Sequence, residues 1–126
     1  QTLGNWSLGQ ILTHLAGSIE GSIDGLPFRA PWFMRMMAPL MKRRFLTQPL
    51  PAGFQIPDKL RGTVFPDATV STADGLDALR YAVSRCQSEE QRAVHPFLGK
   101  LSKEDWDRFN LRHAELHMSF VAPVEE

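Results

Sequence analysis

The most informative chemistry in this sequence lies in two histidines one helical turn apart, His113 and His117. In an α-helix, positions i and i+4 lie on one face about 6 Å apart, so both imidazoles can reach a single point. A buried imidazole has a donor and an acceptor, and leaving either unpaired costs about 1–3 kcal/mol. The polar nitrogens of His113 and His117 can be satisfied in two ways, by binding a metal ion or by hydrogen bonds within the core. The histidines share their helical stripe with Trp106, Phe109, Leu116 and Phe120.

A third imidazole is available from His14, near the other end of the chain. Its helical direction differs by about 120–130° from the apolar stripe around it, so His14 is expected on the flank of that helix. There it is either exposed or able to reach a metal held by a neighbouring helix. Three histidines would leave a coordination position open for water or substrate. Imidazole nitrogens suit zinc, nickel, cobalt, copper or ferrous iron, so the ligands do not select the metal.

His95 and Cys86 are two further residues with reactive side chains. His95 precedes Pro96, which favours extended backbone, in the loop that leads to the histidine helix. Bracing this loop is the simplest role for His95, and a contact to substrate or an extra ligand is the alternative. Cys86 lies on the apolar face of its predicted helix, which indicates a buried small hydrophobe and not a nucleophile.

No carboxylate is placed to act with the histidines. Glu115 follows His113 by two residues and not one, so the HExxH pattern of zinc proteases is absent. Glu20 and Asp24 lie one or two turns beyond His14, and their predicted directions do not converge on the same point.

Helices are predicted around both ends of this constellation. The first covers residues 8–23, with Ser7 as N-cap, Gln10 completing a capping box and Trp6 packing on Ile11. The last begins at Ser102, again a good N-cap, and extends to about residue 121.

Two more helices are predicted between them. One follows Pro31 and reaches Leu46, with a kink at Pro39. The other opens near Ser71 or Thr72 and ends before Val94. Residues 47–70 lose the helical period and are rich in proline and glycine, so a long loop is expected there, with Phe54, Ile56, Leu60, Val64 and Phe65 as apolar anchors. With no alternating strand pattern, the fold class is all-α, an antiparallel helical bundle.

Composition narrows the function classes. The 126 residues suit one domain spanning 1–126, and 14 basic against 14 acidic residues provide no field that would attract nucleic acid. A single cysteine suits a reducing compartment, so a cytoplasmic location is expected. No apolar run spans a bilayer and no signal peptide is evident, so no membrane partner is expected.

The Trp6-Ser7-Leu8 and His14-Leu15 segments, the 95–101 sequence HPFLGKL and the pair His113xxxHis117 resemble the DinB/YfiT-like metalloenzyme superfamily over nearly the whole chain, and more narrowly one of its uncharacterised branches. The resemblance implies a DinB-like four-helix bundle with a long Pro-rich loop between helices 2 and 3. It also implies a divalent metal, commonly nickel or zinc, bound by His14, His113 and His117. A further helix usually precedes the Trp-Ser segment in this superfamily. Here that helix is expected to be absent: either it has been lost, or residues 31–46 or a partner subunit would fill its place. A homodimer is expected.

Two functions follow from these expectations. The first is a metal-dependent enzyme, a hydrolase or thiol-dependent transferase, in which the metal activates water or a thiol toward a small-molecule substrate. The second is a non-catalytic, metal-stabilised bundle whose loop and Met-rich helix bind a ligand or a protein.

Overall fold

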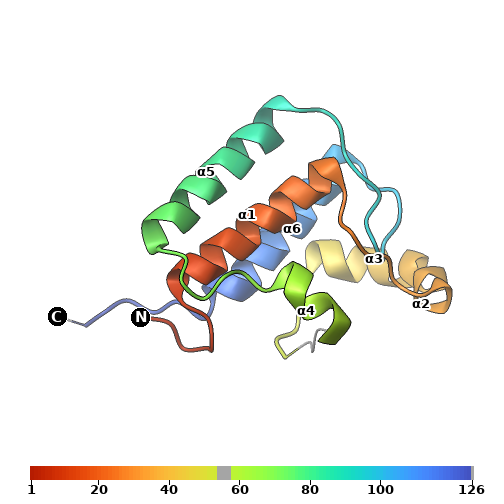
Figure 1. The fold of residues 1–126 in the computed structure, drawn as a ribbon. Coiled ribbons are helices and arrows are strands. Elements are labelled where there is room, and N and C mark those ends of the chain that lie inside the picture. The colour runs from red at the N-terminus through yellow and green to blue at the C-terminus, as the bar shows by residue number, and fades with distance from the viewer. Residues whose placement is uncertain (54–57, 126) are drawn as a thin grey trace.

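A computed structural model describes residues 1–53 and 58–125, and across these residues the chain forms helices and no strand (Figure 1). Six helices are present in the described part: α1 Leu8–Asp24, α2 Trp32–Met36, α3 Ala38–Thr47, α4 Asp58–Val64, α5 Thr72–Ser88 and α6 Lys103–Met118. The all-α class is therefore confirmed, whereas a four-helix bundle is not. None of the described helices combines the length and apolar character that crossing a bilayer requires.

Serine N-caps set the starts of the three long helices, as the sequence predicts for Ser7 and Ser102. Ser7 Oγ accepts from Gln10 N at 3.2 Å while the Gln10 side chain accepts from Ser7 N at 2.9 Å. Ser71 and Ser102 each accept a hydrogen bond from the backbone N–H three residues on. Each serine satisfies an amide that the first turn of a helix leaves without a partner.

The single kinked helix predicted after Pro31 is wrong. The chain instead forms α2 and α3, which are separated at Met37. Pro39 lies in the first turn of α3, where its missing N–H has no helical partner to lose. Pro39, which is predicted to kink a helix, therefore lies at the start of a new one.

The unbroken loop predicted over residues 47–70 is also wrong, because α4 lies inside it. Leu60 and Val64 are half-buried and four residues apart, so two helical turns suffice to place both on one side. Surrounding prolines and Gly62 hide this short period in the sequence. Phe54 and Ile56, predicted as anchors, lie outside the described residues.

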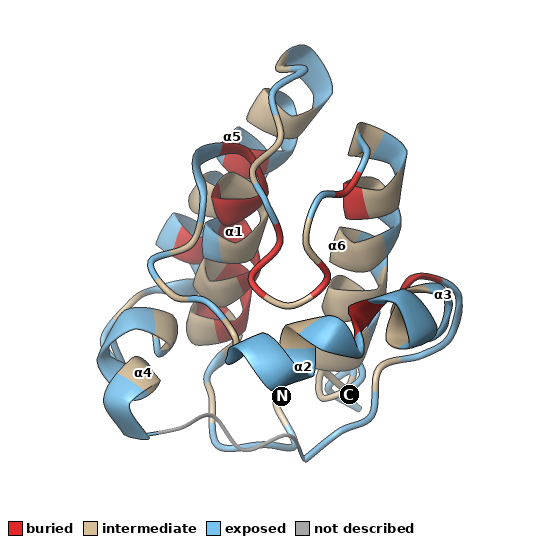
Figure 2. Cartoon of the chain, turned by 90° about the vertical axis from the view of Figure 1, so that its right-hand side faces the viewer, coloured by how far each residue is buried: buried red, intermediate tan, exposed pale blue. Residues whose placement is uncertain are grey.

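The buried residues gather on α1 and in the segment that leads to α6, whereas α2 and α4 are largely exposed (Figure 2). α1 packs against α5 on one side and α6 on the other, and α3 packs against α6. The core beneath α3 contains Ala38, Leu46, Leu98, Leu101 and Trp106, edged by Phe45, Phe97 and Phe109.

The α1–α5 contact is close because glycines face each other across it. A β-carbon built on Gly75 would lie 2.7 Å from Gly9 O, and one built on Gly9 would lie 2.7 Å from Ser71 O. Both oxygens belong to the backbone, so neither can move without shifting its helix or the segment that leads into it. The two glycines therefore fix how near α5 comes to α1.

Replacing Gly75 with alanine is expected to lower the free energy of unfolding by about 1–3 kcal/mol, because the backbones must separate. Gly17→Ala is the matched control, since a β-carbon there meets nothing within 4 Å. It should raise the free energy of unfolding by about 0.5–1 kcal/mol through improved helix propensity. Urea unfolding followed by circular dichroism measures both, and equal effects would contradict the close-contact account.

Candidate metal centre

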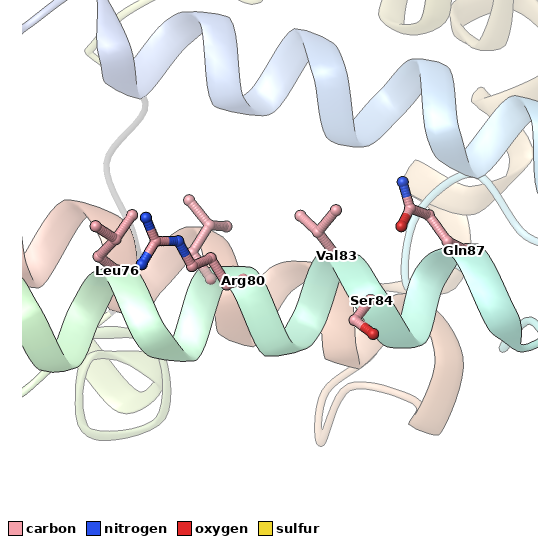
Figure 3. A pocket seen from close by; sticks show the side chains of 6 residues that line it. Leu76, Arg80, Val83, Ser84 and Gln87 are labelled. Carbon is pink, nitrogen blue, oxygen red and sulfur yellow. The ribbon is translucent and has the colours of Figure 1, made fainter.

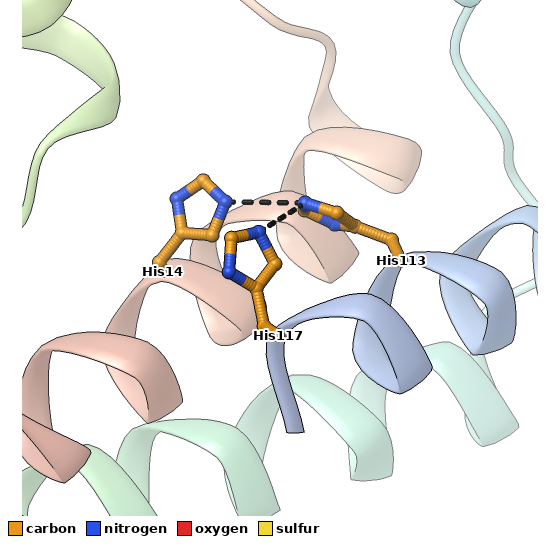
Figure 4. A group of neighbouring side chains, drawn as sticks. All are labelled: His14, His113 and His117. Carbon is orange, nitrogen blue, oxygen red and sulfur yellow. Dashed lines mark hydrogen bonds between the residues drawn. The ribbon is translucent and has the colours of Figure 1, made fainter. Parts of the chain in front are cut away.

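His14, His113 and His117 meet between α1 and α6 and bring their Nε2 atoms together (Figure 4). His113 Nε2 lies 3.2 Å from His14 Nε2 and 3.0 Å from His117 Nε2. All three side chains are half-buried. Among the described residues this is the one group of three or more histidine, cysteine, aspartate or glutamate side chains that could hold a metal ion.

The outer nitrogens of two of these rings are held by α4 and α1. His14 Nδ1 lies 3.2 Å from the carbonyl oxygen of Val64, which can only accept, so Nδ1 carries the proton and donates it. His113 Nδ1 lies 3.1 Å from Ser18 Oγ. The neutral His14 ring consequently presents an unprotonated Nε2 to the centre of the cluster. Hydrogen bonds to the far nitrogen of this kind orient histidines that ligate metals.

The spacing of the Nε2 atoms suits ligands of one ion. Two nitrogens each about 2.0–2.1 Å from a zinc ion at a tetrahedral angle lie about 3.4 Å apart, and a right angle brings them to about 3.0 Å. The separations of 3.0 and 3.2 Å fall in this range. In the absence of a metal, the inward lone pair of His14 Nε2 would require a proton on His113 Nε2, which His117 Nε2 also approaches.

Polar residues continue this arrangement along the α1–α6 interface. Ser22 Oγ accepts from Asn110 Nδ2 at 3.4 Å, one turn beyond the contact between Ser18 and His113. The helices are antiparallel, so residues 14, 18 and 22 of α1 face residues 117, 113 and 110 of α6. This stripe places polar groups where α1 and α6 would otherwise bury apolar side chains.

Trp6 forms an aromatic wall beside the cluster. Its ring stacks on His117 with centroids 5.7 Å apart and meets His14 edge-on at 4.9 Å. Phe65, just after α4, meets Trp6 edge-on with ring centroids 5.2 Å apart. Sequence reasoning assigned Trp6 only to a contact with Ile11 and did not find Ser18 or the Val64 carbonyl. The serine spacing of α1, read against the histidines of α6, is the signal that could have found Ser18.

Burial keeps the three imidazoles neutral. Loss of solvation, together with a smaller effect of the neighbouring histidines, lowers the pKa of His113 to about 3 and that of His117 to about 4. The pKa of His14 is also lowered by burial, although its bond to Val64 opposes this. Neutral imidazole is the form that ligates a metal.

His95 does not join the cluster. It is buried, and its Nδ1 accepts the backbone N–H groups of Phe97 at 3.1 Å and Leu98 at 2.9 Å. Its ring packs against Phe109 at 4.6 Å, and Phe109 stacks on His113 at 6.1 Å. His95 therefore braces the 95–99 turn and touches the cluster only through Phe109.

The carboxylates lie away from the cluster, as predicted. Arg85 binds Glu20 at 3.4 Å and Asp24 at 2.6 Å. Glu115 pairs with Arg112 at 3.2 Å.

The prediction that Cys86 is a buried hydrophobe is wrong in part. Its thiol is half-buried and has polar neighbours, Asp107 Oδ1 at 3.5 Å and an Arg92 nitrogen at 3.3 Å. The helix face predicted as apolar meets Arg92, whose side chain folds back over the end of α5. Burial raises the pKa of this thiol, which disfavours the nucleophilic thiolate.

The geometry defines a class of protein: the described residues form helices, and two of these helices bring three histidines together. Residues 1–124 match the family described as "Protein of unknown function (DUF1569)", and the chain belongs to this family. No curated protein and no solved structure matches the chain.

The buried His95 is expected to make stability depend on pH. Burial lowers its pKa from 6.5 to about 4, so between these values the unfolded chain binds more protons than the folded chain. The stabilisation is present above pH 6.5 and is lost as the pH falls toward about 4, by about 3 kcal/mol in total.

His95→Asn isolates this effect, because asparagine keeps an acceptor for the turn but does not titrate. The gap in unfolding free energy between parent and variant, measured in urea across this pH range, should narrow as the pH falls. A gap that stays constant would contradict the assignment.

Proposed function

We propose that this chain is a divalent-metal-dependent enzyme in which His14, His113 and His117 hold the metal, with nickel or zinc expected. One observation carries the proposal: three neutral imidazoles direct their Nε2 atoms to one point while Val64 and Ser18 hold two of the rings from behind. The DUF1569 family is part of the DinB/YfiT-like superfamily, which supports the same ligand set.

A divalent metal with three protein ligands would supply a Lewis acid that lowers the pKa of a coordinated water or thiol. The Val64 carbonyl and the Ser18 hydroxyl would keep the imidazoles turned inward, and Trp6 would shield one side from solvent. Because Glu20, Asp24 and Glu115 are engaged with arginines, the small-molecule substrate or the thiol itself would carry the transferred proton. A hydrolase or thiol-dependent transferase fits these limits, and a reducing, cytoplasmic setting suits a thiol co-substrate.

Cobalt loading of the purified chain tests the proposal, because cobalt reports its ligands in the visible spectrum. We expect one cobalt ion per chain and a change in the spectrum when a thiol such as 2-mercaptoethanol is added. His14→Ala, His113→Ala and His117→Ala should each abolish stoichiometric uptake. Ser18→Ala should weaken metal affinity by about 10–100-fold, as loss of a group that orients a ligand does.

His95→Asn is the matched control, since it changes the fourth histidine and leaves the cluster intact. It should take up cobalt as the parent does. Stoichiometric uptake that survives the three alanine substitutions would overturn the ligand assignment. Uptake with a spectrum that no thiol or substrate analogue alters would favour the second function below.

The second candidate is a binding module stabilised by the metal. One observation favours it: α2 and the start of α3 expose a surface, here called the α2 surface, of Trp32, Phe33, Met36, Met37 and Leu40, each at least 52% exposed. Methionine and aromatic side chains adapt to varied apolar partners. A groove of about 290 Å³ on α5 is lined by Leu76, Leu79 and Val83, and Figure 3 shows Leu76 and Val83 projecting from one side of α5. These two surfaces are where we would place the contact of a homodimer.

A further inference from the structure

A cationic cavity lies apart from the three histidines, between α2, α3 and the turn at residues 95–100. Its volume is about 360 Å³, within the range of small-ligand sites. Arg29, Arg35, Lys42 and Lys100 line it together with His95. Four basic residues around one small cavity favour an anion.

Most of this positive charge has no acidic partner in the described part of the chain. Lys42 pairs with Asp105 at 3.0 Å, and Asp105 also binds Arg108 at 3.1 Å. No ion pair involves Arg29, Arg35 or Lys100 within residues 1–53 and 58–125. The sequence contains no aspartate or glutamate from residue 25 to residue 57.

Two residues that line this cavity each have a donor without an acceptor among the described residues. Arg35 Nε is shielded from solvent and has no hydrogen-bond partner there. His95 Nδ1 accepts two amides, so the proton of the neutral ring lies on Nε2, which donates no hydrogen bond to the described residues. A shielded donor without an acceptor is costly, and an anionic oxygen would satisfy it.

The walls of the cavity are held in place by contacts outside it. Ala30 N donates to Pro96 O at 3.0 Å, which ties the chain before α2 to the turn. Phe45 of α3 packs against Phe97 with ring centroids 5.6 Å apart. The basic side chains therefore project from backbone segments whose spacing is fixed before any ligand binds.

We propose that this cavity binds a phosphate group through the guanidinium groups of Arg35 and Arg29, with Lys100, Lys42 and the Nε2–H of His95 as further donors. Guanidinium groups match the paired oxygens of a phosphate, and the net positive charge suits a dianion. The phosphate belongs either to a soluble ester or to a lipid headgroup. The site needs no metal, so it stands or falls independently of the three-histidine centre.

Nuclear magnetic resonance of the metal-free chain titrated with inorganic phosphate at constant ionic strength tests the site. We expect saturable shifts of the Arg35 Nε–H and of the Gly99 and Lys100 amides. Arg35→Gln should weaken binding at least about tenfold, as loss of charged hydrogen bonds does. Arg35→Lys keeps the positive charge but not the planar guanidinium group, so its phosphate affinity should fall between those of the parent and Arg35→Gln. Arg43→Gln is the control, because Arg43 is an exposed cation of α3 that does not line the cavity.

Co-sedimentation with vesicles identifies the source of the phosphate. Binding to vesicles that contain phosphatidic acid, whose phosphate is a monoester, but not to phosphatidylcholine vesicles, lost in Arg35→Gln, would assign the site to a lipid headgroup. Saturable phosphate binding without vesicle binding would assign it to a soluble ester. Absence of both, or equal losses in Arg35→Gln and Arg43→Gln, would overturn the proposal.

Discussion

The contact between α1 and α6 requires the polar side chains of its centre to satisfy one another. Two antiparallel helices usually pack through apolar side chains. Here histidine and serine of α1 face histidine and asparagine of α6. Three neutral imidazoles have three lone pairs and three protons, but the proton of His14 is directed outward to the Val64 carbonyl, so its inward lone pair requires a donor or a bound cation. The remaining structure holds α1 and α6 at the separation that brings the three Nε2 atoms together.

Rigid packing surrounds the cluster on several sides. The facing glycines bring α5 against α1, and the buried Trp106 fixes α6, donating from its indole nitrogen to Ala93 O at 2.9 Å. α4 supplies the Val64 carbonyl that sets the orientation of His14. Trp6 fills the space between α4 and the histidines. A site built on helices and braced in this way keeps its ligand geometry without a metal to organise it.

The helix starts and the histidine positions could be predicted from the sequence, because local rules of helix capping and helix periodicity govern them. The serine caps Ser7 and Ser102 predict the starts of α1 and α6, and the i, i+4 spacing predicts that His113 and His117 share one face. His14 was expected on a flank of its helix, and there it meets His113. α6 ends at Met118, three residues before the predicted end at residue 121, because the apolar period of the sequence continues past the last helical turn.

The failures share a different cause, since they depend on tertiary contacts. Pro39 can kink a helix or begin one, and its own sequence does not distinguish the two. α4 is stable only against the rest of the chain, because an isolated helix of seven residues is too short to persist in water. The roles of Trp6, Ser18 and the Val64 carbonyl require knowledge of which segment faces which. The position of the histidines was therefore accessible from sequence, and the groups that orient them were not.

X-ray absorption spectroscopy of the zinc-loaded chain tests the central claim most directly, because it reports the atoms bound to the metal. The account predicts three imidazole ligands with Zn–N distances of about 2.0–2.1 Å and at least one further oxygen or nitrogen from solvent. In His113→Ala this imidazole signature should disappear. A sulfur ligand, or a spectrum with fewer imidazoles that His113→Ala leaves unchanged, would contradict the account.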